Sequence, residues 1–182
     1  MIPPDLLLNE ALVYAVSQVQ ELSHKKPNER LPKEAVLQCA IYHFYMNKGY
    51  FVHPESAYFP AGKKKNMSCD LRVIGESELW IELKTARDAR GLISKIDEEK
   101  EKWEKDGSKL DNSPPNSRAA FVLFTFTEDN PENSNKRIFK EINKLWDGGY
   151  GFTKVVTADL TWPQSEIKFI TVYRPSQIHK SA

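Results

Sequence analysis

Apolar residues recur at helical spacing in two segments of the amino-terminal third. The first segment follows a capping candidate, Asp5. Its apolar positions are Leu8, Leu12, Ala15, Val16, Val19 and Leu22. The second segment begins near Pro32, carries Glu34 in its first turn and stops at a glycine. Its apolar positions are Val36, Leu37, Ala40, Ile41, Phe44 and Tyr45. This spacing predicts helices over 5–24 and from about 32 to 49.

Shorter apolar runs bounded by turn residues predict six strands. These strands cover about 50–55, 69–74, 79–85, 119–127, 153–158 and 167–174. Helical spacing predicts two further helices, over about 88–106 and 134–149. The run at 119–127 is the most apolar in the chain, which is typical of a central strand buried on both faces. Pro54 indicates that the first strand lies at a sheet edge or ends there.

The order of these elements predicts one α/β domain of the mixed, α+β type. Helices that alternate with groups of strands favour a central mixed β-sheet flanked by α-helices on both faces. The chain of 182 residues is long enough for a single core, which we place at about 32–127 within one domain, 1–182. The predicted helix 5–24 precedes this core, and a helix and two strands over 134–174 follow it. The strand-helix-strand unit over 79–127 is expected to be a right-handed crossover.

The charges nearly cancel, with 26 Lys and Arg residues against 25 Asp and Glu residues and a formal net charge of +1. A polyanion must therefore be bound by a local patch. Cys39 and Cys69 lie in apolar surroundings without a CxxC pair, so both are interpreted as packed thiols in a reducing compartment. Asp5 and Glu10 interrupt the first apolar run, which fits neither a signal peptide nor a membrane span. We expect a cytoplasmic protein with no membrane partner.

Four charged residues interrupt the two apolar strands predicted within the hairpin CDLRVIGESELWIELKTAR, which runs from Cys69 to Arg87. They are Asp70, Arg72, Glu82 and Lys84. Because side chains alternate along a strand, Glu82 and Lys84 share one face with Trp80, while Ile81 and Leu83 face the core. The charges of the second strand are thus expected on the face away from the core.

Asp70 reaches the same face only in certain registers of the hairpin. It must lie opposite Glu82 or Lys84, because paired residues in an antiparallel ladder point to the same side. Both pairings require an odd-length connection, either 76–78 or 75–79. A two-residue turn would turn Asp70 to the wrong face.

Two carboxylates with a nearby lysine suit metal-assisted hydrolysis of a phosphodiester. Carboxylate oxygens are the ligands that Mg²⁺ prefers, and Mn²⁺ substitutes for it. The metal lowers the pKa of a bound water, and a lysine orients that water or stabilises the charged transition state. A carboxylate-pair hydrolase acting on sugars is disfavoured, because Lys84 has no task in that chemistry. No zinc-ligand spacing, P-loop or glycine-rich dinucleotide turn is present.

Asp70, eleven intervening residues and then Glu82-Leu83-Lys84 resemble the signature of the PD-(D/E)xK nuclease superfamily, which has the restriction-endonuclease-like fold. The predicted order helix, three strands, helix, strand matches the core of that family. Cys69 stands where the family name has proline. The resemblance implies a Mg²⁺-dependent endodeoxyribonuclease in which water attacks in line and leaves a 5′-phosphate. A catalytically inactive nuclease-like fold that binds nucleic acid or a partner protein remains the alternative.

The resemblance also implies roles for individual residues. The catalytic residues are Asp70, Glu82 and Lys84, with Glu34 in support. The metal ligands are Asp70, Glu82, the carbonyl of Leu83, and Glu34 or Glu55. The expected partner is nucleic acid, with DNA as the main candidate, and the active form is a homodimer or a complex with a partner protein. Candidate phosphate contacts are Lys63, Lys64, Lys65, Arg72, Arg87 and Arg90, with Arg72 also a candidate structural counter-ion.

Overall fold

The computed structural model describes residues 1–25, 34–58, 67–87, 117–128, 153–162 and 165–175, together with residues 98, 101, 102, 105, 110 and 114. The helical elements are η1 (Pro4–Leu7), α1 (Leu8–Lys25) and α2 (Glu34–Asn47). The strands are β1 (Phe51–Tyr58), β2 (Met67–Ile74), β3 (Glu78–Arg87), β4 (Ser117–Glu128), β5 (Thr153–Trp162) and β6 (Ser165–Pro175). The two helices and six strands fall where the sequence predicts them, and every strand is longer than predicted.

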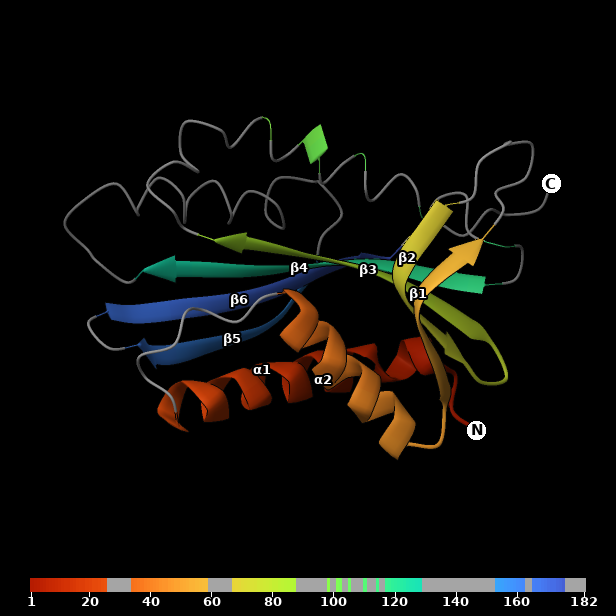
Figure 1. The fold of residues 1–182 in the computed structure, drawn as a ribbon, viewed down its shortest axis with the longest axis horizontal. Helices are drawn as coiled ribbons and strands as arrows, with labels where there is room; N and C mark the ends of the chain where they lie inside the picture. Colours follow the sequence, from red (N-terminus) through yellow and green to blue (C-terminus); the bar gives the residue numbers. More distant parts are fainter. Residues whose placement is uncertain are drawn as a thin grey trace.

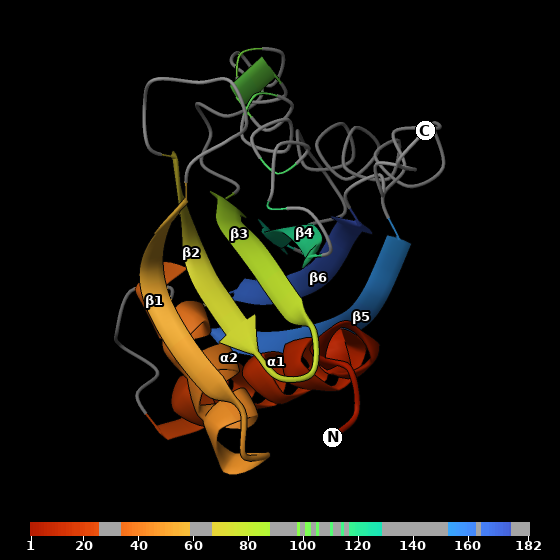
Figure 2. The same cartoon turned by 90° about the vertical axis from the view of Figure 1, so that its right-hand side faces the viewer.

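The six strands form one mixed sheet in the order β1-β2-β3-β4-β6-β5 (Figures 1 and 2). Strands β3 and β4 are parallel, and the other neighbouring strands are antiparallel. The mixed α/β class is therefore confirmed. β1, which contains Pro54, lies at one edge of the described sheet, as predicted. β4 lies inside the sheet, and its residues from Ala119 to Phe124 are all buried, which confirms the prediction of a central strand.

Helices α1 and α2 cover the same face of the sheet (Figures 1 and 2). One core cluster joins them to the side chains of β2, β3 and β4 that point toward the helices. Its sheet residues include Leu71, Val73, Leu79, Ile81, Leu83, Ala120, Val122 and Phe124. Its helix residues include Leu12, Val16, Val19, Leu37, Ile41 and Tyr45. Burial of each such side chain contributes about 1.5–3 kcal/mol, so this face anchors α2 firmly against the hairpin.

The opposite face of the central strands is also shielded from solvent. Trp80, Phe121 and Leu123 alternate with the core residues and are 2% exposed or less. The helices predicted on this face, over 88–106 and 134–149, lie outside the described residues, except that positions 98, 101, 102 and 105 are helical. Among the described residues, no helix is both long and apolar enough to cross a bilayer.

The prediction that both cysteines are packed is wrong for Cys39. Cys69 is buried, whereas Cys39 is exposed. Cys39 lies two residues from both Leu37 and Ile41, which is about 200° around the helix from each. Because Leu37 and Ile41 face the sheet, Cys39 must face solvent.

Candidate active site

The register between β2 and β3 brings the two predicted acidic residues opposite one another. The numbers of the paired residues sum to 152 in every rung, and residues 75–77 join the strands. The prediction of an odd-length connection is therefore confirmed, although the connection starts one residue before the predicted 76–78 and is shorter than 75–79. Continued one residue beyond its last rung, this register places Asp70 opposite Glu82.

Two backbone N–H groups at the open end of this hairpin donate to carboxylates. The N–H of Leu83 donates to Oδ2 of Asp70 at 2.5 Å, and the N–H of Thr85 donates to Oε2 of Glu34 at 3.1 Å. The ladder with β2 ends at Ile81. Because N–H groups two residues apart point to the same edge of a strand, both donors lie on the edge that β2 no longer pairs. The side chains of Asp70 and Glu34 take the place of the missing strand partner.

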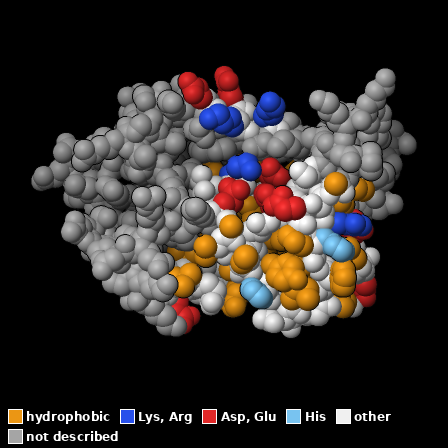
Figure 3. All heavy atoms as spheres, in the orientation of Figure 1, with side chains coloured by type: hydrophobic (Ala, Val, Ile, Leu, Met, Phe, Trp, Pro, Cys, Tyr) orange, Lys and Arg blue, Asp and Glu red, His pale blue; other side chains and the backbone are white. Residues whose placement is uncertain are grey.

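Glu82 is buried, with 5% of its surface exposed. Among the residues whose burial the structure describes, no other charged residue is buried. A buried carboxylate is costly unless it is paired. The Nζ of Lys84 lies 3.3 Å from Oε1 of Glu82 and 3.9 Å from Oε1 of Glu34. The structure therefore brings together all four residues that the sequence predicts to be catalytic. Acidic and basic side chains lie next to each other near the middle of the face in Figure 3.

Glu55 extends the acidic row onto β1. Pro54 pairs with Leu71 and Ser56 pairs with Cys69, so position 55 falls opposite Asp70 in the register of β1 with β2. When the register of β2 with β3 is continued by one residue, positions 55, 70 and 82 fall in line across three neighbouring strands. Glu55 has a φ of +48°, in the left-handed region, and among the described residues no other non-glycine has a positive φ. Both glutamates left open by the sequence, Glu34 and Glu55, thus reach the same end of the hairpin from different elements.

Gln38 is a site residue that the sequence analysis missed. Its Nε2 donates to the backbone oxygen of Asp70 at 2.8 Å and to Oε1 of Glu55 at 3.2 Å. Gln38 continues a stripe on α2 that runs from Glu34 to Ile41 and Tyr45 at spacings of four, three and four residues. A polar residue within such a buried stripe is the signal that could have identified it.

Cys69 is a neutral neighbour of the acidic residues. Burial, followed by the negative charges of Glu82 and Asp70, raises the pKa of its thiol to about 12. Its Sγ donates to the carbonyl of Leu71 at 3.2 Å. A thiol that stays protonated near neutral pH is neither a metal ligand nor a nucleophile.

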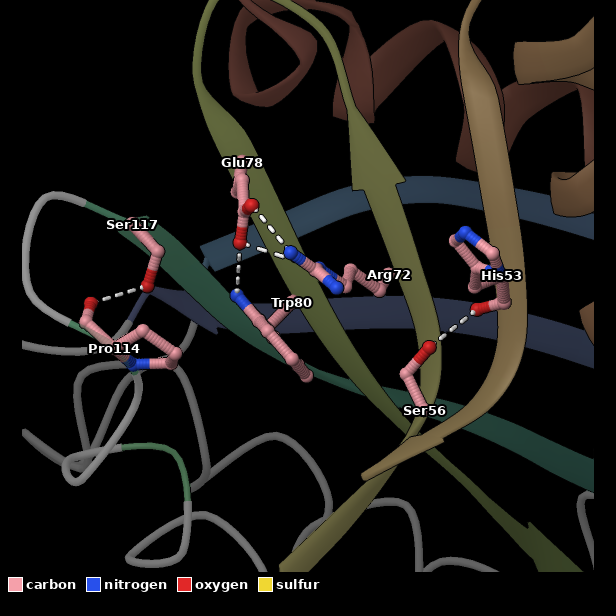
Figure 4. A network of polar contacts seen from close by, with 7 residues as sticks. All are labelled: His53, Ser56, Arg72, Glu78, Trp80, Pro114 and Ser117. Atoms are coloured by element: carbon pink, nitrogen blue, oxygen red, sulfur yellow. Dashed lines mark hydrogen bonds and ion pairs between the residues drawn. The ribbon is translucent and has the colours of Figure 1, made fainter. Parts of the chain in front are cut away.

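Arg72 is held by an acid on its own sheet face (Figure 4). Its Nη2 and Nε lie 2.5 and 3.2 Å from the carboxylate oxygens of Glu78, and its guanidinium lies 4.9 Å from the ring centroid of Trp80. The indole N–H of Trp80 donates to the same carboxylate at 3.2 Å. This geometry favours the structural counter-ion role over the phosphate contact, because a phosphate would have to displace Glu78.

The remaining predicted phosphate contacts have no described side chains. Lys63, Lys64, Lys65 and Arg90 lie outside the described residues. Arg87 is the last residue of β3, and its backbone pairs with Phe126 on β4. Their roles in binding nucleic acid stay predictions.

The donor set fits a magnesium ion. In the part of the chain that the structure describes, no group of three or more His, Cys, Asp or Glu side chains is placed to hold a metal ion. Mg²⁺ does not require such a group, since proteins usually hold it through one or two carboxylates while water and substrate phosphate supply the other ligands. Asp70 and Glu82, whose positions fall opposite each other when the register of β2 with β3 is continued by one residue, offer two carboxylates of this kind.

Comparisons with known proteins return no relative for this chain. No protein-family model matches it, no curated protein matches it, and no solved structure matches it.

Proposed function

We propose that this chain is a metal-dependent nuclease with a restriction-endonuclease-like core that hydrolyses phosphodiester bonds, with DNA as its expected substrate. The observation that carries the proposal is the contact of Asp70 with the N–H of Leu83 at 2.5 Å, next to Glu82, whose Oε1 lies 3.3 Å from the Nζ of Lys84. The order α2, β1, β2, β3, with β4 parallel to β3, supports the same core. A purely structural hairpin has no need of a buried carboxylate at this position.

Each residue of the site has a distinct task in this reaction. When bound, Mg²⁺ lowers the pKa of a water and offsets charge on the phosphate oxygens. Asp70, Glu82 and the carbonyl of Leu83 would hold the ion. Asp70 is itself fixed by the N–H of Leu83. Lys84 directs its ammonium toward the attacking water and the developing negative charge.

Glu34 supports the site from the first turn of α2. It is anchored by the N–H of Thr85, and its second oxygen lies 3.9 Å from the Nζ of Lys84. This contact, together with the one from Glu82, orients the lysine side chain, which would otherwise sample many rotamers. Glu34 therefore acts on the reaction through Lys84.

A substrate panel tests the proposal. The protein is incubated with plasmid, linear duplex DNA, single-stranded DNA and RNA in the presence of Mg²⁺ or Mn²⁺. We expect metal-dependent cleavage of at least one substrate, lost by about 100-fold or more in Asp70→Ala and Lys84→Ala. Lys48→Ala is the matched control, because Lys48 lies beyond the far end of α2, where its Nζ is 3.7 Å from Oε2 of Glu10. This variant should cleave at the wild-type rate.

Two results would contradict the proposal. One is the absence of cleavage under every condition, and the other is undiminished cleavage by Asp70→Ala and Lys84→Ala. If the protein retains nucleic acid but neither cuts it nor binds Mn²⁺, the catalytically inactive binding module is the better explanation.

A further inference from the structure

We infer that Glu78 is a positioning residue that holds Arg72 toward the turn of the β2–β3 hairpin. Arg72 is thereby kept from competing with Lys84 for the carboxylate of Glu82. This inference rests on the proposed function, and it names a residue that acts on the proposed reaction without touching the substrate.

Arg72 lies between two glutamates on one face of the hairpin. It pairs with Trp80 across β2 and β3. Glu78 and Glu82 lie two residues on either side of Trp80, so alternation places both on the face that carries Arg72. Positions diagonal to a paired residue are about 7–8 Å away, within reach of a long side chain. The guanidinium of Arg72 could therefore pair with either glutamate.

The structure shows Arg72 committed to Glu78 (Figure 4). Its Nη2 and Nε donate to the two carboxylate oxygens of Glu78 at 2.5 and 3.2 Å, which is a bidentate contact. The indole N–H of Trp80 donates to the same carboxylate at 3.2 Å, and the guanidinium lies 4.9 Å from the ring centroid of this buried tryptophan. Since Glu78 is the first residue of β3, these contacts direct the guanidinium toward the turn and away from Glu82.

The position of Lys84 depends on the charge of Glu82. The Nζ of Lys84 lies 3.3 Å from Oε1 of Glu82, a carboxylate that is 5% exposed and therefore little screened by water. Arginine is the stronger competitor for such a group, because it binds a carboxylate through two N–H groups, whereas lysine offers a point charge. A guanidinium on Glu82 would offset the charge that holds the ammonium and would repel it.

The rate at which supercoiled plasmid is cut, measured at saturating DNA, tests this role. Glu78→Gln removes the charge but keeps an amide oxygen that can accept from the indole of Trp80. We expect this variant to cut about 10-fold more slowly than the wild type, because Lys84 is displaced. Its melting temperature should fall by no more than about 4 °C, since the pair of Arg72 and Glu78 is partly exposed.

A second substitution separates positioning from stability. If Glu78 acts by holding Arg72 away from Glu82, the double variant Arg72→Gln, Glu78→Gln should cut about fivefold faster than Glu78→Gln alone, because the competitor is gone. A role confined to the stability of the hairpin predicts the reverse, since the contact of Arg72 with the ring of Trp80 is then lost as well.

Glu76→Gln is the matched control. Glu76 lies in the turn of the same hairpin, and its described partner is the amino group of Met1 at 2.6 Å. This variant makes the same change from acid to amide two residues from Glu78, and it should cut at the wild-type rate.

The remaining outcomes each contradict a defined claim. Wild-type cutting by Glu78→Gln, or a double variant no faster than Glu78→Gln, overturns the inference and leaves the proposed function standing. So does equally slow cutting by Arg72→Gln alone, which would mean that Arg72 acts on the substrate itself. If Glu78→Gln fails to fold, Glu78→Asp, which keeps the charge on a shorter side chain, replaces it in the single and double variants. A wild-type protein that cuts no substrate overturns the proposed function and the inference together.

Discussion

The contacts that position Glu55, Asp70 and Glu82 are only partly predictable from the sequence. Spacing along one strand is enough to place Glu82 beside Lys84, because alternation alone brings them to one face. Asp70 required the register as well, which the sequence limited to odd connections. Gln38 was missed, because its two hydrogen bonds depend on how α2 packs against β1 and β2. A polar residue in the buried stripe of α2 marks Gln38 as a candidate, but the stripe does not show which strand residues its side chain contacts.

The two thiols should differ in reactivity, which tests the environment of the site. Burial and the charges of Glu82 and Asp70 raise the pKa of Cys69 to about 12, so at pH 8 only on the order of one molecule in ten thousand carries its thiolate. Cys39 is exposed. We expect a thiol reagent at pH 8 to modify Cys39 alone in the folded protein and both cysteines in urea, as counted by mass spectrometry.

The same raised pKa of Cys69 has a consequence for stability. Because its pKa is raised on folding, the Cys69 thiol stabilises the folded state fully below the unfolded pKa of 9.0, and this contribution is lost as the pH rises toward 12.

In the modification experiment, rapid reaction of both cysteines in the folded protein at pH 8 would show that Cys69 is not enclosed beside the acidic residues.

At the scale of elements, the β2–β3 hairpin is the part that sets the site. Its apolar positions were predictable, because alternation fixes which residues face α1 and α2. The end of β2 at Ile74 was predicted as well. The connection starts at residue 75, one residue before the predicted 76–78, because the packing of the turn decides where strand pairing stops. Gly75 donates its N–H to the carbonyl of Ser77 at 3.0 Å, and this closes the turn.

Gly75 should be hard to replace, because the turn packs on an aromatic ring. A Cβ added to Gly75 would lie 3.0 Å from the ring of Tyr50. That ring is 4% exposed and its hydroxyl donates to the carbonyl of Ile2, so it cannot retreat easily. We expect Gly75→Ala to lower the free energy of unfolding by about 1–3 kcal/mol in a urea titration. An unchanged midpoint would mean that the turn is looser than the structure has it.

At the scale of the whole molecule, the sequence predicted a mixed sheet with an edge β1 and a buried β4, and the described residues confirm both. The pairing of β6 between β4 and β5 could not be derived, because strand order depends on long-range contacts. The net charge of +1 leaves no global attraction for a polyanion, so binding must come from a local patch.

The lysine run is the strongest such patch in the sequence. Replacing Lys63, Lys64 and Lys65 by Gln should weaken DNA binding and reduce the salt dependence. Each lost phosphate contact should lower the slope of log K against log salt by about 0.9. Fluorescence anisotropy over a range of salt concentrations measures both quantities. An unchanged slope would place the nucleic acid away from this segment.

The most direct test of the site is the rate at which supercoiled plasmid is cut by Glu82→Gln in Mg²⁺. The change removes one charge from the buried carboxylate and keeps its shape, so the fold should persist. Glu10→Gln, at an exposed acid on α1, is the control. We expect Glu82→Gln to cut at least about 100-fold more slowly than the wild type, and Glu10→Gln to cut at the wild-type rate. Equal rates for all three proteins would contradict the assignment of this hairpin as an active site.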